Sequence, residues 1–382
     1  MGGYGGHFDV KFWRAVALMI GGILGVGVFG LPYLFVRSGL SAGLVSLVAL
    51  GAAVCVLNLM YGEIVMRTAG KHRLGGYVKE YLGSGWGVAA SLVMAAAIVG
   101  SLVAFLIVGG RFLHDLFGPT FGGPEWMYAL GLALAVAAAS VKGVRLAAQI
   151  ESPVVCVLLF LFAIVVLVCL PHAKFSNLLG TSSFAAVPFG AVLFALSGGG
   201  IIPDMRELLG GRARRLLPLA ITVGMAAVVA ICAAFAAAVV AVSGAATTPV
   251  AFEGLIPVLG PSFALVTLLL GSVAVFSISL TNTIQLSDIL RIDHRIPSKI
   301  SWAIATGSAF VFYLLGARSF IGVIGFVGAV FGGAVALFII AVYEKVKRET
   351  VCRHAHCLEV PTLVSVLLAI IFLGAMFLEL VK

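Results

Sequence analysis

The sequence predicts an all-α polytopic membrane protein built from two inverted repeats. The 382 residues are 62% hydrophobic and 10% charged with a mean hydropathy of +1.19, values typical of chains that lie in lipid. Apolar runs long enough to cross a bilayer recur along the whole chain. Two of these runs contain a cluster of glycines followed by a proline. These three observations give the fold class, and the elements are justified in turn below.

Apolar runs bounded by charged and turn residues predict eleven spans. They lie near residues 12–36, 41–65, 87–110, 126–141, 149–170, 184–208, 215–242, 262–289, 299–315, 319–343 and 358–380. The first run is longer than the apolar core of a signal peptide, so it is expected to remain as a span.

The positions of the basic residues orient these spans. With the amino terminus in the cytoplasm, 19 of the 24 Lys and Arg residues lie on the inner side. This asymmetry follows the positive-inside rule and predicts, with an odd number of spans, a carboxyl terminus on the outer side. Topology therefore explains the net charge of +9, and no basic surface is left that predicts nucleic-acid binding.

The first span contains GGILGVGVFGLPYLF, residues 21–35, in which Gly25, Gly27 and Gly30 have the G-x-G-x-x-G spacing of a dinucleotide-binding turn. Such a site needs a preceding strand, a following helix and an acidic residue about 20 positions later. None of these is present, because the motif lies inside an apolar run and is followed by Pro32. Glycines also allow close packing of membrane helices. This density of glycine, together with a proline, instead predicts a helix that is interrupted in mid-span.

The sixth span contains a second interruption, LFALSGGGIIPDMRE at residues 193–207. Spans one and six are an odd number of spans apart, so the two interrupted helices are antiparallel. This predicts inverted repeats over residues 12–170 and 184–343, an extra helix at 358–380, and a single transporter domain over 1–382.

Paired interruptions have a direct chemical meaning. Unwound backbone in lipid leaves polar groups unsatisfied, so it is stable only beside a polar cavity. The amino end of a half-helix suits a carboxylate, and the carbonyls at a carboxyl end suit an ammonium group or a cation. A zwitterion such as an amino acid matches both ends.

The two glycine motifs and the eleven-span arrangement resemble the amino acid–polyamine–organocation superfamily, in particular the eleven-span amino acid/auxin permease and aromatic amino acid permease families. The cytoplasmic segment GGYVKEYLGSGWG is also similar to these families. The resemblance implies a LeuT-like 5+5 inverted-repeat carrier bundle with discontinuous helices 1 and 6 and an eleventh helix. It also implies cation-coupled alternating access for amino acids.

Carried onto this chain, the resemblance implies a substrate site formed by Gly22, Ile23, Gly25, Val26, Gly27, Phe194, Ser197 and Gly198. Backbone groups at residues 25–27 would hold the substrate carboxylate. The carbonyls of Gly22, Ile23, Phe194 and Ser197 would take the amino group. Phe194 would cover the substrate, or is otherwise an ordinary core phenylalanine.

The resemblance also implies a coupling-ion site at Gly21, Leu24, Ser277 and Thr281. At 100° per residue, Ser277, Thr281 and Asp288 share one face of the eighth span, and Ser272, Ser279 and Thr283 share nearly the opposite face. Either face suits the site; we favour the first. Span five lacks the lysine of proton-coupled superfamily members, which favours Na+, whereas the eleven-span families include many H+ symporters. The choice between Na+ and H+ is left open.

Acidic residues near the cytoplasmic ends of the spans are candidate gates. Asp204 and Asp288 face the expected inner vestibule and pair with Arg206 or Arg291 as a gate, or are simply solvated helix ends. Glu63 has a structural partner in Arg67, four residues later.

Other chemical signals are weak. The segment CRHAHC, residues 352–357, contains four potential zinc ligands, but six residues are too few to wrap a tetrahedral site. The H-E-x-x-H and G-x-x-x-x-G-K-[ST] motifs are absent from the sequence, so neither a metalloprotease nor an ATP-driven pump is predicted. No cofactor, metal or enzymatic activity is expected.

The sequence therefore predicts a secondary amino acid symporter of the plasma or inner membrane, with an apolar or aromatic substrate. Its partners are the lipid bilayer and the amino acid. The alternative is a sensor that binds an amino acid on the same fold without transporting it. The particular amino acid, the direction of transport and the oligomeric state are not predicted.

Overall fold

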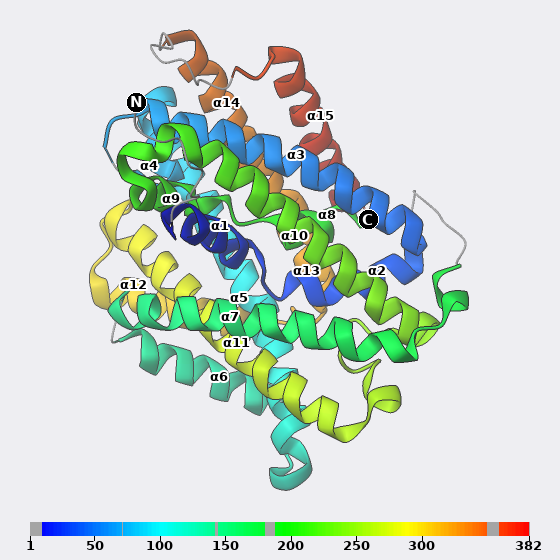
Figure 1. Cartoon of the computed structure of the whole chain (residues 1–382). Helices are drawn as coiled ribbons and strands as arrows, with labels where there is room; N and C mark the ends of the chain where they lie inside the picture. Colours follow the sequence, from blue (N-terminus) through cyan, green and yellow to red (C-terminus); the bar gives the residue numbers. More distant parts are fainter. Residues whose placement is uncertain (1–9, 71, 142–143, 180–187, 350–358, 382) are drawn as a thin grey trace.

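Membrane-length helices form a bundle in the computed structural model, which describes residues 10–70, 72–141, 144–179, 188–349 and 359–381 (Figure 1). Seven helical segments of this part are long and apolar enough to cross a bilayer. They are α3 (Leu40–Arg67), α5 (Ser84–Phe121), α7 (Val144–Cys169), α10 (Ala213–Ser243), α11 (Ile256–Ile292), the segment Phe320–Glu349 and α15 (Thr362–Leu380).

The segment Phe320–Glu349 is itself divided. It consists of α13 (Phe320–Phe326), a π-helical stretch η7 (Val327–Gly332) and α14 (Gly333–Glu349). A π-helical stretch inside a long helix leaves an irregular backbone, and such stretches are frequent at functional sites.

An eighth span is bent. Helices α1 (Val10–Ile23) and α2 (Gly27–Ser38) together have the length and composition of a span, with an angle of 62° between them.

Shorter elements complete the described chain. They are α4 (Leu74–Leu82), α6 (Glu125–Ser140), α8 (Phe189–Leu196), α9 (Ile202–Leu209), α12 (Ser298–Leu314) and the 3-10 turns η1 (Leu170–His172), η2 (Phe175–Leu178), η4 (Gly199–Ile201), η5 (Gly210–Arg212) and η6 (Gly244–Ala246). Helices lie at each of the eleven predicted spans, but α6 and α12 are only 16 and 17 residues long. Where the sixth span was predicted, the structure has the short helices α8 and α9. The count of eleven spans therefore stays a prediction.

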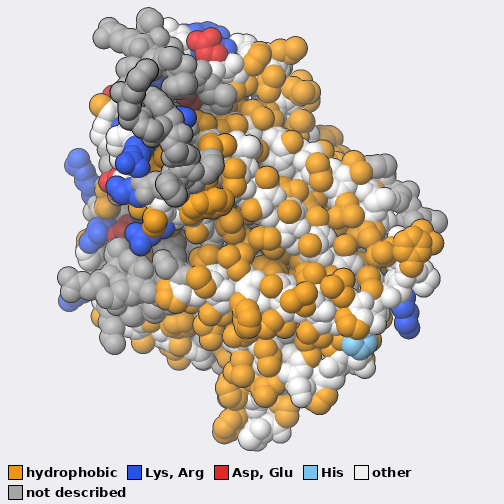
Figure 2. Space-filling view, in the orientation of Figure 1, with side chains coloured by type: hydrophobic (Ala, Val, Ile, Leu, Met, Phe, Trp, Pro, Cys, Tyr) orange, Lys and Arg blue, Asp and Glu red, His pale blue; other side chains and the backbone are white. Residues whose placement is uncertain are grey.

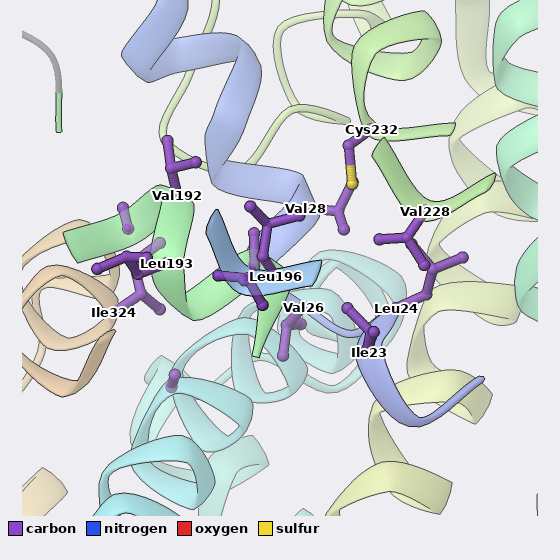
Figure 3. Packing of buried hydrophobic residues seen from close by; sticks show 14 of the residues in the cluster. Ile23, Leu24, Val26, Val28, Val192, Leu193, Leu196, Val228, Cys232 and Ile324 are labelled. Carbon is purple, nitrogen blue, oxygen red and sulfur yellow. The ribbon is translucent and has the colours of Figure 1, made fainter. Parts of the chain in front are cut away.

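The interrupted helices lie at the centre of the bundle. Helix α10 packs against α1, α2, α3 and α7, while α11 packs against α5, α7 and α12. Figure 3 shows Leu24 beside Val228 of α10, and Leu196 of α8 beside Val28 of α2. Leu193 of α8 approaches Ile324 of α13, and these two helices pack together. These apolar contacts hold both interruptions inside the protein, away from lipid.

The surface matches a protein that spans a membrane. Figure 2 shows hydrophobic side chains over the broad middle of one face, and Lys and Arg side chains gathered mainly at one end, on the left of the view. Large apolar side chains such as Leu363 and Leu167 are more than half exposed, which is costly in water but favourable in lipid. The protein is a multi-pass integral membrane protein.

Candidate functional site

The backbone between α1 and α2 carries unpaired polar groups. The N–H groups of Gly25 and Val26 donate to no backbone carbonyl of the described residues. The carbonyls of Gly21 and Gly22, four residues earlier, therefore lack their helical donors. The carbonyl of Leu24 lacks its donor too, because the N–H of Val28 donates to Gly25 at 3.3 Å. Both free donors and free acceptors are thus available within a few residues.

The second interruption follows α8. Ser197 is extended, with φ −76° and ψ 137°, and α9 begins only at Ile202. The N–H of Ser197 donates to the carbonyl of Phe194 at 3.2 Å, and the N–H of Ile201 donates to Gly198 at 3.3 Å. Of the two carbonyls predicted for the amino group in this segment, that of Phe194 is already engaged, whereas that of Ser197 accepts no backbone N–H of the following turn.

The two interruptions touch each other through glycines. A side-chain carbon built on Gly198 would overlap the carbonyl of Gly22 and lie 2.6 Å from Ile23 Cγ1. A carbon built on Gly27 would lie 2.7 Å from Phe194 Cδ1 and 3.0 Å from the Cα of Ala195. Real Cβ atoms essentially never approach neighbours this closely, so glycine is required here for the close approach of two backbones.

A cavity of about 590 Å³ lies at this junction. Its walls come from both interruptions and from α3, α5, α7, α11 and η7. The structure brings all of the sequence-predicted site residues to it: Gly21, Gly22, Ile23, Leu24, Gly25, Val26, Gly27, Phe194, Ser197, Gly198, Asp204, Ser277, Thr281 and Asp288. This volume is within the range of small-molecule sites.

One face of α11 lines the cavity. Ser277, Thr281 and Asp288 are on that face, whereas Ser272, Ser279 and Thr283 are not. The hydroxyls of Ser277 and Thr281 make no hydrogen bond to the described residues, although Ser277 is only 4% exposed. Ser272, by contrast, donates to the carbonyl of Leu268 at 2.7 Å.

Asp288 and Arg206, two charged residues of the predicted gate, have different partners in the structure. Asp288 accepts from Arg291 at 2.9 Å, one of the two predicted pairings. Arg206 donates to the carbonyls of Thr68 and Gly70 at 3.4 and 3.2 Å, and so ties α9 to the end of α3.

The ion pair predicted from spacing alone is confirmed. Arg67 Nε donates to Glu63 Oε1 at 2.6 Å, with both side chains about one-tenth exposed.

Some cavity residues were missed from the sequence. Asn58 and Tyr61 of α3 and Gln285 of α11 contribute polar atoms, and the π-helical stretch η7 contributes wall. The sequence did contain a signal for Asn58 and Gln285, since each is an amide within an apolar run. An amide in a membrane span needs a polar neighbour, so such a residue indicates a polar site. The segment 352–357 lies outside the described residues. Within the described ones, no group of three or more His, Cys, Asp or Glu side chains is placed to hold a metal.

Five aromatic rings pack together beside the first interruption, and one of them, that of Phe29, also lines the cavity. The ring of Phe29 on α2 lies 6.0 Å from that of Phe112, 5.9 Å from Phe162, 6.2 Å from Phe235 and 4.8 Å from Phe252, measured between centroids. All five side chains are buried, and they come from α2, α5, α7, α10 and the segment between η6 and α11. We call these five residues the phenylalanine cluster. Arg73, Asp204 and Asp288 also line the cavity.

Comparison with known sequences gives two matches. The profile of the tryptophan/tyrosine permease family matches residues 9–381. Tyrosine-specific transport system 1 of Haemophilus influenzae is 26% identical over 202 residues, which are 52% of this chain and 50% of that protein. The match thus spans about half the length of that relative.

Solved structures of transporters share the fold. MhsT in complex with L-phenylalanine aligns with a TM-score of 0.69 at 15% identity, covering 100% of this chain and 99% of its own. Mhp1, a nucleobase-cation-symport-1 family transporter, aligns with a TM-score of 0.67 at 12% identity, covering 96% and 91%. A manganese transporter of Eremococcus coleocola aligns with a TM-score of 0.67 at 12% identity, covering 98% and 88%. The matched family and these relatives are transporters rather than enzymes.

Proposed function

Because the chain belongs to the tryptophan/tyrosine permease family, we propose that it is a secondary active transporter that carries aromatic amino acids across the plasma or inner membrane. The observation that carries this proposal is the cavity formed where the interruptions of two helices meet. Its free backbone donors and acceptors suit the two charged ends of an amino acid.

The substrate carboxylate is proposed to bind at the amino end of α2. The N–H groups of Gly25 and Val26 are free to donate to it, and the first turn of α2 adds its partial positive charge. The substrate ammonium group is proposed to bind the carbonyls of Gly22, Ile23 and Ser197 at the ends of α1 and α8. The engaged carbonyl of Phe194 is a weaker candidate for this role.

The side chain of the substrate is proposed to lie among apolar residues. Ile98 and Phe105 of α5, with Phe194 of α8, line the same cavity and offer the surface that an aromatic ring needs. The names of two similar proteins support this choice, since one relative is called tyrosine-specific and MhsT was solved with L-phenylalanine.

A cation is proposed to drive transport, bound by the carbonyls of Gly21 and Leu24 and the hydroxyls of Ser277 and Thr281. In support of this, the two carbonyls lack helical donors and the two hydroxyls make no hydrogen bond to the described residues. Oxygen ligands of this kind suit Na+, which we propose as the coupling ion in preference to H+.

Alternating access is proposed to occur by movement of the two inverted repeats around this cavity. Asp204 and Asp288 are proposed to guard its inner end, with the Asp288–Arg291 pair as one arrangement of the gate.

Uptake into proteoliposomes tests the function. Purified protein is expected to accumulate radiolabelled tryptophan or tyrosine when an inward cation gradient is imposed, relative to protein-free vesicles. Binding without uptake would instead support the sensor alternative, and neither binding nor uptake would overturn the proposal. Replacing external sodium by choline, and separately collapsing the pH gradient with a protonophore, identifies the ion.

A further inference from the structure

Gln285 has an amide that the folded chain leaves unused. It lies on the cavity face of α11 and is half-buried, yet its side chain makes no hydrogen bond to the described residues. The two other amides on the cavity are engaged. Asn282 Nδ2 donates to the carbonyl of Ile278 at 2.9 Å, and Asn58 Nδ2 contacts Met225 Sδ at 3.4 Å. An amide on a cavity wall that the protein does not engage is available to hydrogen-bond a ligand or water.

The position of Gln285 relates it to both interruptions. A carbon built on Gly200 would lie 3.9 Å from Gln285 Nε2, which places the amide beside the second interruption. A carbon built on Gly25 would lie 3.1 Å from Cδ1 of Ile278, a residue seven positions before Gln285 on α11. Seven residues are two helical turns, or about 10.5 Å along the axis. This length is comparable to that of an extended aromatic amino acid.

Apolar side chains that suit a ring line the same cavity. Ile284, the neighbour of Gln285 in the chain, and Ile201, which follows Gly200, line the cavity, as do Phe105 and Phe194 from other helices. The amide of Gln285, next to these apolar side chains, would meet one polar atom at the far end of an apolar group. Tryptophan and tyrosine have this pattern, with an indole N–H and a phenolic O–H respectively, while phenylalanine has only carbon there.

We propose that Gln285 is a specificity-determining residue that hydrogen-bonds the polar atom on the ring of the substrate. This inference rests on the proposed transport of aromatic amino acids. The amide oxygen accepts from the indole N–H or the phenolic O–H, and the amide nitrogen also donates to a phenolic oxygen. Phenylalanine would leave the amide unpaired, and sites that hydrogen-bond a substrate group discriminate strongly against analogues that lack it.

Uptake ratios in proteoliposomes test this role. The unmodified protein is expected to take up tyrosine in preference to phenylalanine. Gln285→Met keeps the length of the side chain but removes its hydrogen bonds, and is expected to lower this preference by about tenfold while phenylalanine uptake is retained. Gln285→Glu keeps an acceptor for the O–H and is expected to retain the preference.

Asn282→Leu is the matched control. It also removes an amide from the cavity face of α11, but one already engaged by Ile278, so the ratio of tyrosine to phenylalanine uptake is expected to stay unchanged. An unchanged ratio in Gln285→Met, or equal uptake of tyrosine and phenylalanine by the unmodified protein, would overturn the inference while leaving transport intact. Absence of uptake for all three aromatic amino acids would instead overturn the proposed function.

Discussion

The rings of Phe29 and Phe252 lie 4.8 Å apart, although more than 220 residues separate them in the sequence. Phe29 is in the first turn of α2, directly after the first interruption, and Phe252 is in the segment before α11. The N–H of Ala251 donates to the carbonyl of Phe29 at 3.2 Å, so backbone and ring contacts coincide. The half-helix that lines the cavity is thereby joined to the segment that covers one end of the bundle.

Removing one ring of the phenylalanine cluster is expected to loosen the packing of the segment before α11 against α2. Phe252→Ala removes a fully buried ring, at a cost of about 3–5 kcal/mol to the packed arrangement. The measurement is the rate at which an impermeant thiol reagent labels Val250→Cys, a fully buried position, after the native cysteines are replaced. Labelling is expected to accelerate. Phe121→Ala, at a ring that is 78% exposed, is the control, and equal rates in both variants would contradict this role.

A methyl group at the first interruption is expected to disrupt the site. Gly27→Ala places a carbon 3.0 Å from the backbone of Ala195, which cannot move aside as a flexible side chain can. Uptake of the aromatic substrate is expected to fall by about tenfold or more, because a misplacement of about 1 Å in positioning groups is costly. Gly131→Ala on α6 meets nothing within 4 Å and is the control, with uptake expected unchanged.

Loss of one hydroxyl is expected to weaken cation dependence. Ser277→Ala removes an unpaired, cavity-lining oxygen, so the sodium concentration for half-maximal uptake is expected to rise by about tenfold. Ser272→Ala is the matched control on the same helix, since its hydroxyl donates to Leu268 and does not line the cavity. Identical sodium curves for the two variants would remove Ser277 from the ion site.

Breaking the buried ion pair at the end of α3 is expected to destabilise the fold. Glu63→Ala removes the carboxylate that accepts from Arg67 Nε at 2.6 Å, in surroundings where both side chains are about one-tenth exposed. The expected loss is about 3–5 kcal/mol in the free energy of unfolding, measured by titration with SDS in mixed micelles. Glu349→Ala breaks an exposed pair with Lys345 and is expected to cost about 0–1 kcal/mol. Equal losses would show that burial does not strengthen the first pair.

Glu253, in the segment before α11, is expected to make stability depend on pH. Burial raises the pKa of its carboxyl, Arg111 at 3.3 Å lowers it, and Asp115 and Glu125 raise it, with a net upward shift from the ordinary 4.5. The folded state therefore holds a proton more tightly than the unfolded state. Its stabilising contribution is complete below the ordinary pKa and is lost as the pH rises through the raised value.

The apparent unfolding temperature, followed from about pH 4 to about pH 7, checks this sign. Glu253→Gln cannot titrate, so the downward trend with rising pH is expected to flatten relative to the unmodified protein. Glu349→Gln, at a side chain that is 53% exposed, is expected to keep the trend. An upward trend that depends on Glu253 would contradict the assignment.

The interruptions could be read from the sequence because their cause is local. Glycine and proline weaken a helix wherever they occur in it. The glycine-rich stretches at residues 21–32 and 197–203, each of which ends in a proline, therefore indicated where α1 and α8 end. Periodicity also placed Ser277 and Thr281 on one face of α11, but left two opposite faces as candidates. The packing of α11 against α5 and α7 determines which of the two faces lines the cavity.

Two features depended on tertiary packing. The unused amide of Gln285 is recognisable only once Asn58 and Asn282 are seen to be engaged. The π-helical stretch η7 lies in a run rich in glycine but without proline, and it forms where the chain meets α8 through Gly190 and Gly328. Its place on the cavity wall was therefore not predictable.

By itself, the sequence determined that the chain lies in a membrane, where two of its helices stop, and which small set of backbone groups those stops leave free. These properties depend on hydrophobicity and backbone propensity, which act over neighbouring residues. The tertiary structure alone decided which side chains meet across the cavity, and that five phenylalanines from distant segments pack together beside it. Such contacts join residues far apart along the chain, so their geometry is set by how whole helices pack and not by any local pattern.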